Sequence, residues 1–118
     1  MLSAETTLRR LVIGDRALLC AIADLDQGDA DVVRLDERSE ALVRLGVLVA
    51  LDAPQSAYQA AVAAATLAGA SFDNVVACLL AVAGEVGTTR VISAAPRIAL
   101  AAGYDVDAAL EATAPLEP

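Results

Sequence analysis

The chain has 118 residues, which fits a single domain over residues 1–118, and 58% of these residues are hydrophobic but only 3% aromatic. Its formal net charge is −8, and it contains neither lysine nor histidine. We therefore expect no nucleic-acid partner, because binding nucleic acid requires clustered basic side chains. The lack of histidine removes the commonest metal ligand and the commonest general base near neutral pH, so we also expect no metal and no cofactor.

An uncharged stretch over residues 53–72 is close to the length of a membrane span, but its composition argues against one. It includes Pro54, Gln55 and Gly69, and its apolar residues are mostly alanine. No basic segment precedes an apolar run near Met1, so we expect no signal peptide. We therefore expect a soluble, cytoplasmic protein without a membrane partner.

Two short helices are predicted at the start of the chain. Residues 6–13 form the first, with Arg9 and Arg10 facing water, and Asp15 caps the second, which runs to residue 23. The buried side of the second helix is expected to consist of Leu18, Leu19 and Ile22. The stretch over residues 24–31 is acidic and contains Gly28, so it is predicted to be a loop. It is not expected to bind calcium, because it lacks the spacing and the closing glutamate of a calcium-binding loop.

The next two helices have clear start signals. Asp36 is a good N-cap for a helix that runs to residue 51, in which Glu40 and Arg44 form an i,i+4 pair. The apolar face of this helix is expected to consist of Leu42, Leu45 and Val49. Pro54 suits the start of an alanine-rich helix over residues 55–68.

The segment over residues 75–83 dominates the predicted architecture, because it contains no charge, amide or hydroxyl. Ser71 caps the helix that contains it, and this helix is expected to end near Gly84. A helix that is apolar on every side cannot lie on the surface of a small monomer. We therefore expect it to pack between other helices and between the subunits of a homo-oligomer.

The remaining elements are also predicted to be helical. A helix begins just after Gly87, and Pro96 either kinks it or marks a fresh start with Ser93 as the cap. A last short helix covers residues 108–112, and residues 114–118 fray. No strand-like alternation of useful length occurs, so the predicted class is all-α.

The two cysteines, Cys20 and Cys78, are too far apart in the sequence for a zinc site or a redox pair. Both lie in apolar helical sequence, so we expect both to be buried small hydrophobic residues. A thiol peroxidase is the least favoured activity, because no resolving cysteine lies near either thiol.

Three segments follow one another in a familiar order: LDERSEALVRLGVLVAL (residues 35–51), an alanine-rich helix ending in AGAS (residues 68–71), and FDNVVACLLAVAG (residues 72–84). Together they resemble the carboxymuconolactone decarboxylase family, which shares its fold with the AhpD alkylhydroperoxidases. The ending VGTTRVISAAPRIALAAGYDVDAALE (residues 86–111) is similar to a divergent, actinobacterial-type branch of that family. The core of the resemblance covers residues 35–111.

The resemblance implies an AhpD-like antiparallel helical bundle that assembles into dimers, trimers or hexamers, with its site near a subunit boundary. The reactive groups of the family do not carry over. The Cys-x-x-Cys pair and the histidine of the AhpD branch align with Pro54, Ala57 and Ala61, and the histidine of the decarboxylase branch aligns with Ala81. The chain has therefore lost the family's activity or uses other groups.

Five side chains remain as candidates for chemistry or binding. Glu85, at a glycine-flanked bend, acts as an acid or base if it is desolvated; otherwise it faces water or forms an ion pair with Arg90 or Arg97. Arg90 and Arg97, on one helix face, either clamp a small carboxylate or form salt bridges between subunits. Cys78 is a nucleophile only beside a cation and is inert in an apolar surround. Tyr58 either donates a hydrogen bond to a ligand or packs with its hydroxyl at the rim.

We therefore expect an oligomeric carboxymuconolactone decarboxylase-like protein that binds a small ligand or serves in assembly without the family's catalytic residues. The alternative is an enzyme of the decarboxylase, lyase or hydrolase type that acts on a small organic acid or lactone. In that case Glu85 is the acid or base, and Arg90 or Arg97 is the carboxylate clamp. Thiol peroxidase activity through Cys78 ranks third.

Overall fold

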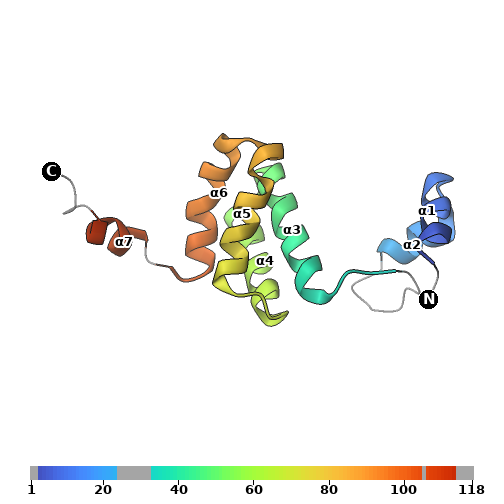
Figure 1. Ribbon diagram of the computed structural model, residues 1–118, viewed down its shortest axis with the longest axis horizontal. Helices are drawn as coiled ribbons and strands as arrows, with labels where there is room; N and C mark the ends of the chain where they lie inside the picture. Colours follow the sequence, from blue (N-terminus) through green and yellow to red (C-terminus); the bar gives the residue numbers. More distant parts are fainter. Residues whose placement is uncertain (1–2, 24–32, 105, 114–118) are drawn as a thin grey trace. The chain divides into compact units, whose positions relative to one another are not determined.

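The computed structural model describes residues 3–23, 33–104 and 106–113, and all regular elements in these ranges are α-helices (Figure 1). The all-α class is therefore confirmed for the described residues. The loop predicted over residues 24–31 and the fraying predicted for 114–118 lie outside them. The chain divides into two compact units, Met1–Leu35 and Asp36–Pro118, and each is described by itself. The single domain over residues 1–118 stays a prediction.

The first unit contains α1 (Ala4–Val12) and α2 (Arg16–Ala23). Asp15 caps α2 as predicted, since its carboxylate accepts a hydrogen bond from the Leu18 N–H at 3.0 Å. The same carboxylate pairs with the Arg10 guanidinium at 3.3 Å. Both bonds favour the ionised carboxylate, so the pKa of Asp15 is lowered, with the Arg10 hydrogen bond as the largest cause. The expectation that Arg10 faces water is wrong, because this pair leaves it half-buried.

The predicted buried side of α2 is only partly correct. Leu18 is buried, but Leu19 and Ile22 are 49% and 39% exposed. A two-helix unit has too few neighbouring elements to cover a full apolar stripe, so the helical period identifies the apolar side without guaranteeing its burial.

The second unit is built on four helices, with a further helix after them. The four are α3 (Glu37–Leu51), α4 (Gln55–Leu67), α5 (Phe72–Val86) and α6 (Thr88–Ala101), and α7 (Val106–Thr113) follows. α3 packs against α4 and α5, and α6 packs against the same two helices. Short connections make consecutive helices antiparallel, so α3 and α5 run in the same direction side by side (Figure 1).

The starts of α3 and α5 confirm the predicted caps. The Asp36 carboxylate accepts hydrogen bonds from the Ser39 N–H at 3.1 Å and the Ser39 hydroxyl at 2.7 Å. Ser71 and Asn74 form a reciprocal capping box on α5, each side chain accepting from the other's backbone N–H. These bonds satisfy N–H groups that have no partner inside the helix and fix where each helix begins.

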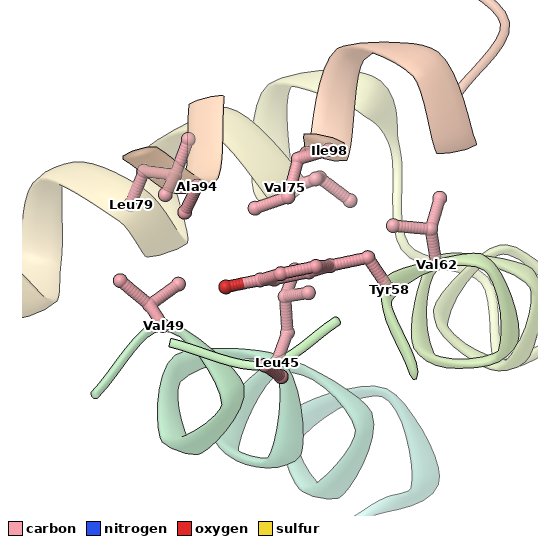
Figure 2. Close-up of a cluster of buried hydrophobic side chains, with 9 residues drawn as sticks. Leu45, Val49, Tyr58, Val62, Val75, Leu79, Ala94 and Ile98 are labelled. Atoms are coloured by element: carbon pink, nitrogen blue, oxygen red, sulfur yellow. The ribbon is translucent and has the colours of Figure 1, made fainter. Parts of the chain in front are cut away.

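The core lies where the four helices meet, as Figure 2 shows. It consists of Leu45, Val49, Ala53, Tyr58, Val62, Val75, Leu79, Ala94 and Ile98. Leu45 and Val49 are the buried members of the predicted apolar face of α3. A second, smaller cluster of Ala41, Ala65 and Ala70 lets α3 and α4 approach closely, because each residue carries only a methyl group.

Two predicted helix boundaries are wrong. α5 continues past Gly84 to Val86 and ends only at Gly87, whose φ of 89° requires glycine. One glycine inside a helix costs about 1 kcal/mol, which the packing of the flanking turns outweighs. α6 runs unbroken through Pro96, so the predicted fresh start with Ser93 as its cap is wrong. The Ser93 hydroxyl instead donates to the Asp52 carboxylate at 3.1 Å.

Candidate functional site

A groove of about 600 Å³ runs between the parallel helices α3 and α5. Its lining contains one amide and one thiol but no charged group, and the other side chains are apolar. The lining residues are Leu42, Val43, Gly46, Val47, Ala50, Asn74, Ala77, Cys78, Ala81 and Val82. Such a surface can hold apolar matter but offers no acid, base or anion clamp.

Gly46 forms the floor of the groove and is buried. A Cβ atom at this position would lie 3.0 Å from Val82 Cγ1 and 3.7 Å from the Cys78 Sγ. The glycine therefore lets α3 and α5 approach more closely than any larger residue would permit.

The outward side of the two helices is apolar and is not covered by the other helices of the second unit. Val43 and Val47 on α3 are 55% and 50% exposed, and Leu80 on α5 is 72% exposed. Within residues 75–83, Val75 and Leu79 are buried in the core, but Val76 remains 38% exposed beside Leu80. The second unit therefore covers only one side of the helix that is apolar all round.

Cys78 lines the groove as a half-buried, hydrogen-bonded thiol, so it is less buried than expected. Its Sγ donates to the Leu42 carbonyl at 3.2 Å. Burial raises the pKa of the Cys78 thiol, because a thiolate is poorly solvated there. The thiol therefore stays protonated near neutral pH and is a weak nucleophile. Cys20, which was also expected to be buried, is exposed, so that prediction is wrong.

Arg97 belongs to the corner where α3 turns into α4, not to the groove. Its Nη1 donates to the Ala53 carbonyl at 2.6 Å and to the Asp52 carboxylate at 3.4 Å. Gln55 Nε2 in turn donates to the Arg97 carbonyl at 2.8 Å. These bonds join the α3–α4 turn to α6, and they occupy the guanidinium that was a candidate carboxylate clamp.

A second, polar hollow of about 610 Å³ lies beside this corner. It is lined by Asp52, Val86, Gly87, Thr88, Thr89, Arg90 and Ser93. Arg90 is exposed there, two helical turns before Arg97, whose guanidinium is bonded to the Ala53 carbonyl. Glu85 is also exposed and lines neither this hollow nor the groove. The structure therefore does not bring Glu85, Arg90 and Arg97 together.

Tyr58 is a core residue in the structure. Its side chain is fully buried, and its hydroxyl donates to the Leu48 carbonyl at 3.1 Å. Burial raises the pKa of Tyr58, with the nearby Asp52 carboxylate adding to the shift and Arg97 opposing it. The expectation that its hydroxyl lies at a rim is wrong, because the Leu48 carbonyl at the end of α3 satisfies it inside the protein.

The positions that the sequence resemblance aligns with reactive groups of the carboxymuconolactone decarboxylase family lie in two places. Pro54 precedes α4, and Ala57 and Ala61 pack against the core. Ala81 lines the groove. The α3 side of the groove was not predicted from the sequence. Val43 and Val47 nevertheless repeat at helical spacing on a side of α3 other than its core face. That second apolar stripe is the signal that could have revealed it.

Comparisons with known proteins do not assign the chain to a family: no family model, no curated protein and no solved structure matches it. Within the described ranges, every helix is too short or too polar for a bilayer span. Among the same residues, no three or more His, Cys, Asp or Glu side chains gather where they could hold a metal ion.

Proposed function

We propose that this chain is a homo-oligomeric binding or assembly protein of the carboxymuconolactone decarboxylase-like type that works without the family's catalytic residues. The observation that carries the proposal is the groove between α3 and α5, which is apolar and open but contains no reactive group except a protonated thiol. A surface of this composition favours association and offers nothing for acid–base or nucleophilic chemistry.

The energetics of covering this surface are consistent with self-association. Fully burying a valine or leucine side chain contributes about 1.5–3 kcal/mol. Val43, Val47 and Leu80 are each at least half exposed, so covering them in two copies contributes on the order of 5–10 kcal/mol. Association costs roughly 4–15 kcal/mol in lost translational and rotational freedom. The apolar gain is of the size needed to offset that cost.

The family part of the proposal rests on the order of the segments. LDERSEALVRLGVLVAL supplies α3, AGAS forms the turn after α4, and FDNVVACLLAVAG supplies most of α5. Gly46 and the alanines of α4, which allow close helix packing, lie within the segments that carry the resemblance. A cytoplasmic location belongs to the same proposal.

The enzymatic alternative has less geometric support. An acid or base acting on an organic acid must lie within hydrogen-bond reach of the same ligand as the carboxylate clamp. Glu85 lies outside the hollow that Arg90 lines, and Arg97 is bonded to the α3–α4 corner. Thiol peroxidase chemistry through Cys78 also requires a thiolate, which burial disfavours.

Multi-angle light scattering on the full chain tests the proposal. We expect a mass of at least two chains, each of 12.0 kDa, at micromolar concentrations. A mass of one chain across the accessible concentration range would contradict the oligomeric function. Turnover of a small organic acid that disappears in Glu85→Gln, while the protein stays folded, would instead support the enzymatic alternative.

A further inference from the structure

We infer that the outer face of α3 and α5 is an isologous interface that a second copy of this chain covers, with Leu80 of each copy seated over the groove of the other. By outer face we mean Val43, Val47, Ala50, Ala77, Leu80 and Ala81. The inference rests on the proposed function and deepens it, since it names the surface and the partner through which the chain assembles.

The outer face carries both parts of a self-complementary contact. Leu80 is a projecting side chain, 72% exposed, while the groove beside it has a glycine floor at Gly46 and alanine walls at Ala77 and Ala81. A two-fold interface requires that the same patch supply the projection and the hollow, because each copy presents an identical surface. Side chains of one helix pair can then enter the grooves of the other, as they do in helical bundles.

A second copy explains more of this surface than a small ligand does. A ligand in the groove would cover the lining residues, but Leu80 and Val76 do not line the groove and would remain in water. A second helix pair laid across the face covers the groove and Leu80 together. The occupant that accounts for both is therefore another α3/α5 pair.

The area of the outer face is consistent with an interface that covers all of it. α3 and α5 have 15 residues each, so each is about 22 Å long. Two such helices packed side by side present an outline of roughly 450 Å². Stable interfaces bury about 600–1,000 Å² of accessible surface per partner, and this area follows side-chain contours and exceeds the outline. Only pairing over the full length of both helices reaches that range, which produces a four-helix arrangement across the two-fold axis.

The distribution of charged residues also favours the outer face as the interface. The groove lining has no charged residue, although the chain carries a net charge of −8. Two acidic copies repel one another, and burying any of their charges would add a desolvation penalty. Contact centred on the uncharged groove keeps that penalty to the edge of the interface and leaves mainly a longer-range repulsion, which salt screens. We therefore expect association to strengthen as salt is raised.

Sedimentation equilibrium of the full chain and its variants tests the inference. Leu80→Asp places a charge at the centre of the contact, and we expect it to raise the dissociation constant at least about 100-fold. Leu67→Asp is the matched control, because Leu67 is 90% exposed on α4, away from the outer face. It should change the dissociation constant by less than about threefold.

A second variant, Val47→Asp, tests the α3 side of the face, and circular dichroism checks that each variant keeps its helices. We expect Val47→Asp to weaken association as Leu80→Asp does. If the wild-type chain is oligomeric but both variants assemble normally, another surface makes the contact; this inference then fails while the proposed function stands. If Leu67→Asp weakens association equally, the effect is one of added charge and the inference also fails. A wild-type chain that stays monomeric overturns both proposals.

Discussion

The groove between α3 and α5 and the polar hollow beside the α3–α4 corner have similar volumes. They differ in whether the side chains around them already have partners within the second unit. At the corner, Asp52, Ser93 and Arg97 bond to one another and to the backbone. In the groove, the Cys78 thiol is bonded and the apolar side chains above it remain in water. The polar residues of this unit therefore stabilise its own fold, and the surface that still lacks a partner is hydrophobic.

Among the substitutions that test this difference, we expect the largest effect on stability at the groove floor. Gly46→Leu forces a side chain against Val82, because even a Cβ atom would lie 3.0 Å from Val82 Cγ1. We expect it to lower the free energy of unfolding by about 2–3 kcal/mol through overpacking. Urea denaturation at fixed protein concentration measures this.

Gly84→Leu is the matched control, since a Cβ atom there meets nothing within 4 Å and Gly84 lies inside α5. It should raise the free energy of unfolding by roughly 0.5–1 kcal/mol, because leucine is the better helix former. Equal destabilisation by both changes would mean that close approach at Gly46 does not hold α3 and α5 together.

A smaller effect is expected at the corner. Arg97→Met keeps most of the aliphatic side chain but removes the hydrogen bond to the Ala53 carbonyl. We expect the free energy of unfolding to fall by about 1–2 kcal/mol. This value is at the low end for a charged hydrogen bond, because the Arg97 side chain is about one-third exposed and solvent screens its interactions. Arg90→Met, on an exposed side chain of the same helix, should change the free energy by less than about 0.5 kcal/mol. If the two variants lose the same amount, the corner bonds contribute nothing specific.

The smallest effect concerns the Cys78 thiol. In Cys20→Ser, only Cys78 reacts with a thiol probe, and we expect this reaction at pH 8 to be at least about 10-fold slower than that of Cys20 in Cys78→Ser. Fast reaction of Cys78 in the native protein would show that it is accessible as a thiolate.

The raised pKa of Cys78 also predicts a pH dependence of stability. The folded chain holds the thiol proton more tightly than the unfolded chain, so the free energy of unfolding should fall as the pH rises above the ordinary thiol value of 9.0. Cys78→Ala removes this contribution and should flatten the decline. An unchanged decline in that variant would assign it to other groups.

Local structure was largely readable from the sequence because its signals are local. Asp15, Asp36 and Ser71 cap helices at the predicted places, since a short polar side chain satisfies N–H groups only a few residues away. The failures came where distant contacts compete with local signals. α5 passes through Gly84 and α6 through Pro96 because packing against neighbouring helices stabilises both.

The candidate site was less predictable than the fold. Glu85 and Arg90 were selected because they interrupt apolar sequence, but both are exposed at helix ends in the chain. Arg97 was selected for the same reason, and a backbone carbonyl 44 residues away in the sequence occupies it. No pattern along the chain reveals which carbonyl a guanidinium will meet, because that depends on how the helices pack.

The sequence by itself determined that the chain is helical in its described parts, where its main helices begin, and that the segment over residues 75–83 has more apolar surface than one small unit can use. These properties depend on composition, period and neighbouring residues. Only the tertiary structure decided which side of that helix stays uncovered and that a groove floored by Gly46 lies beside it. It also decided that Tyr58 and Arg97 form hydrogen bonds that stabilise the fold. Those outcomes depend on which helices become neighbours, and burial is a property of the neighbours rather than of the residue.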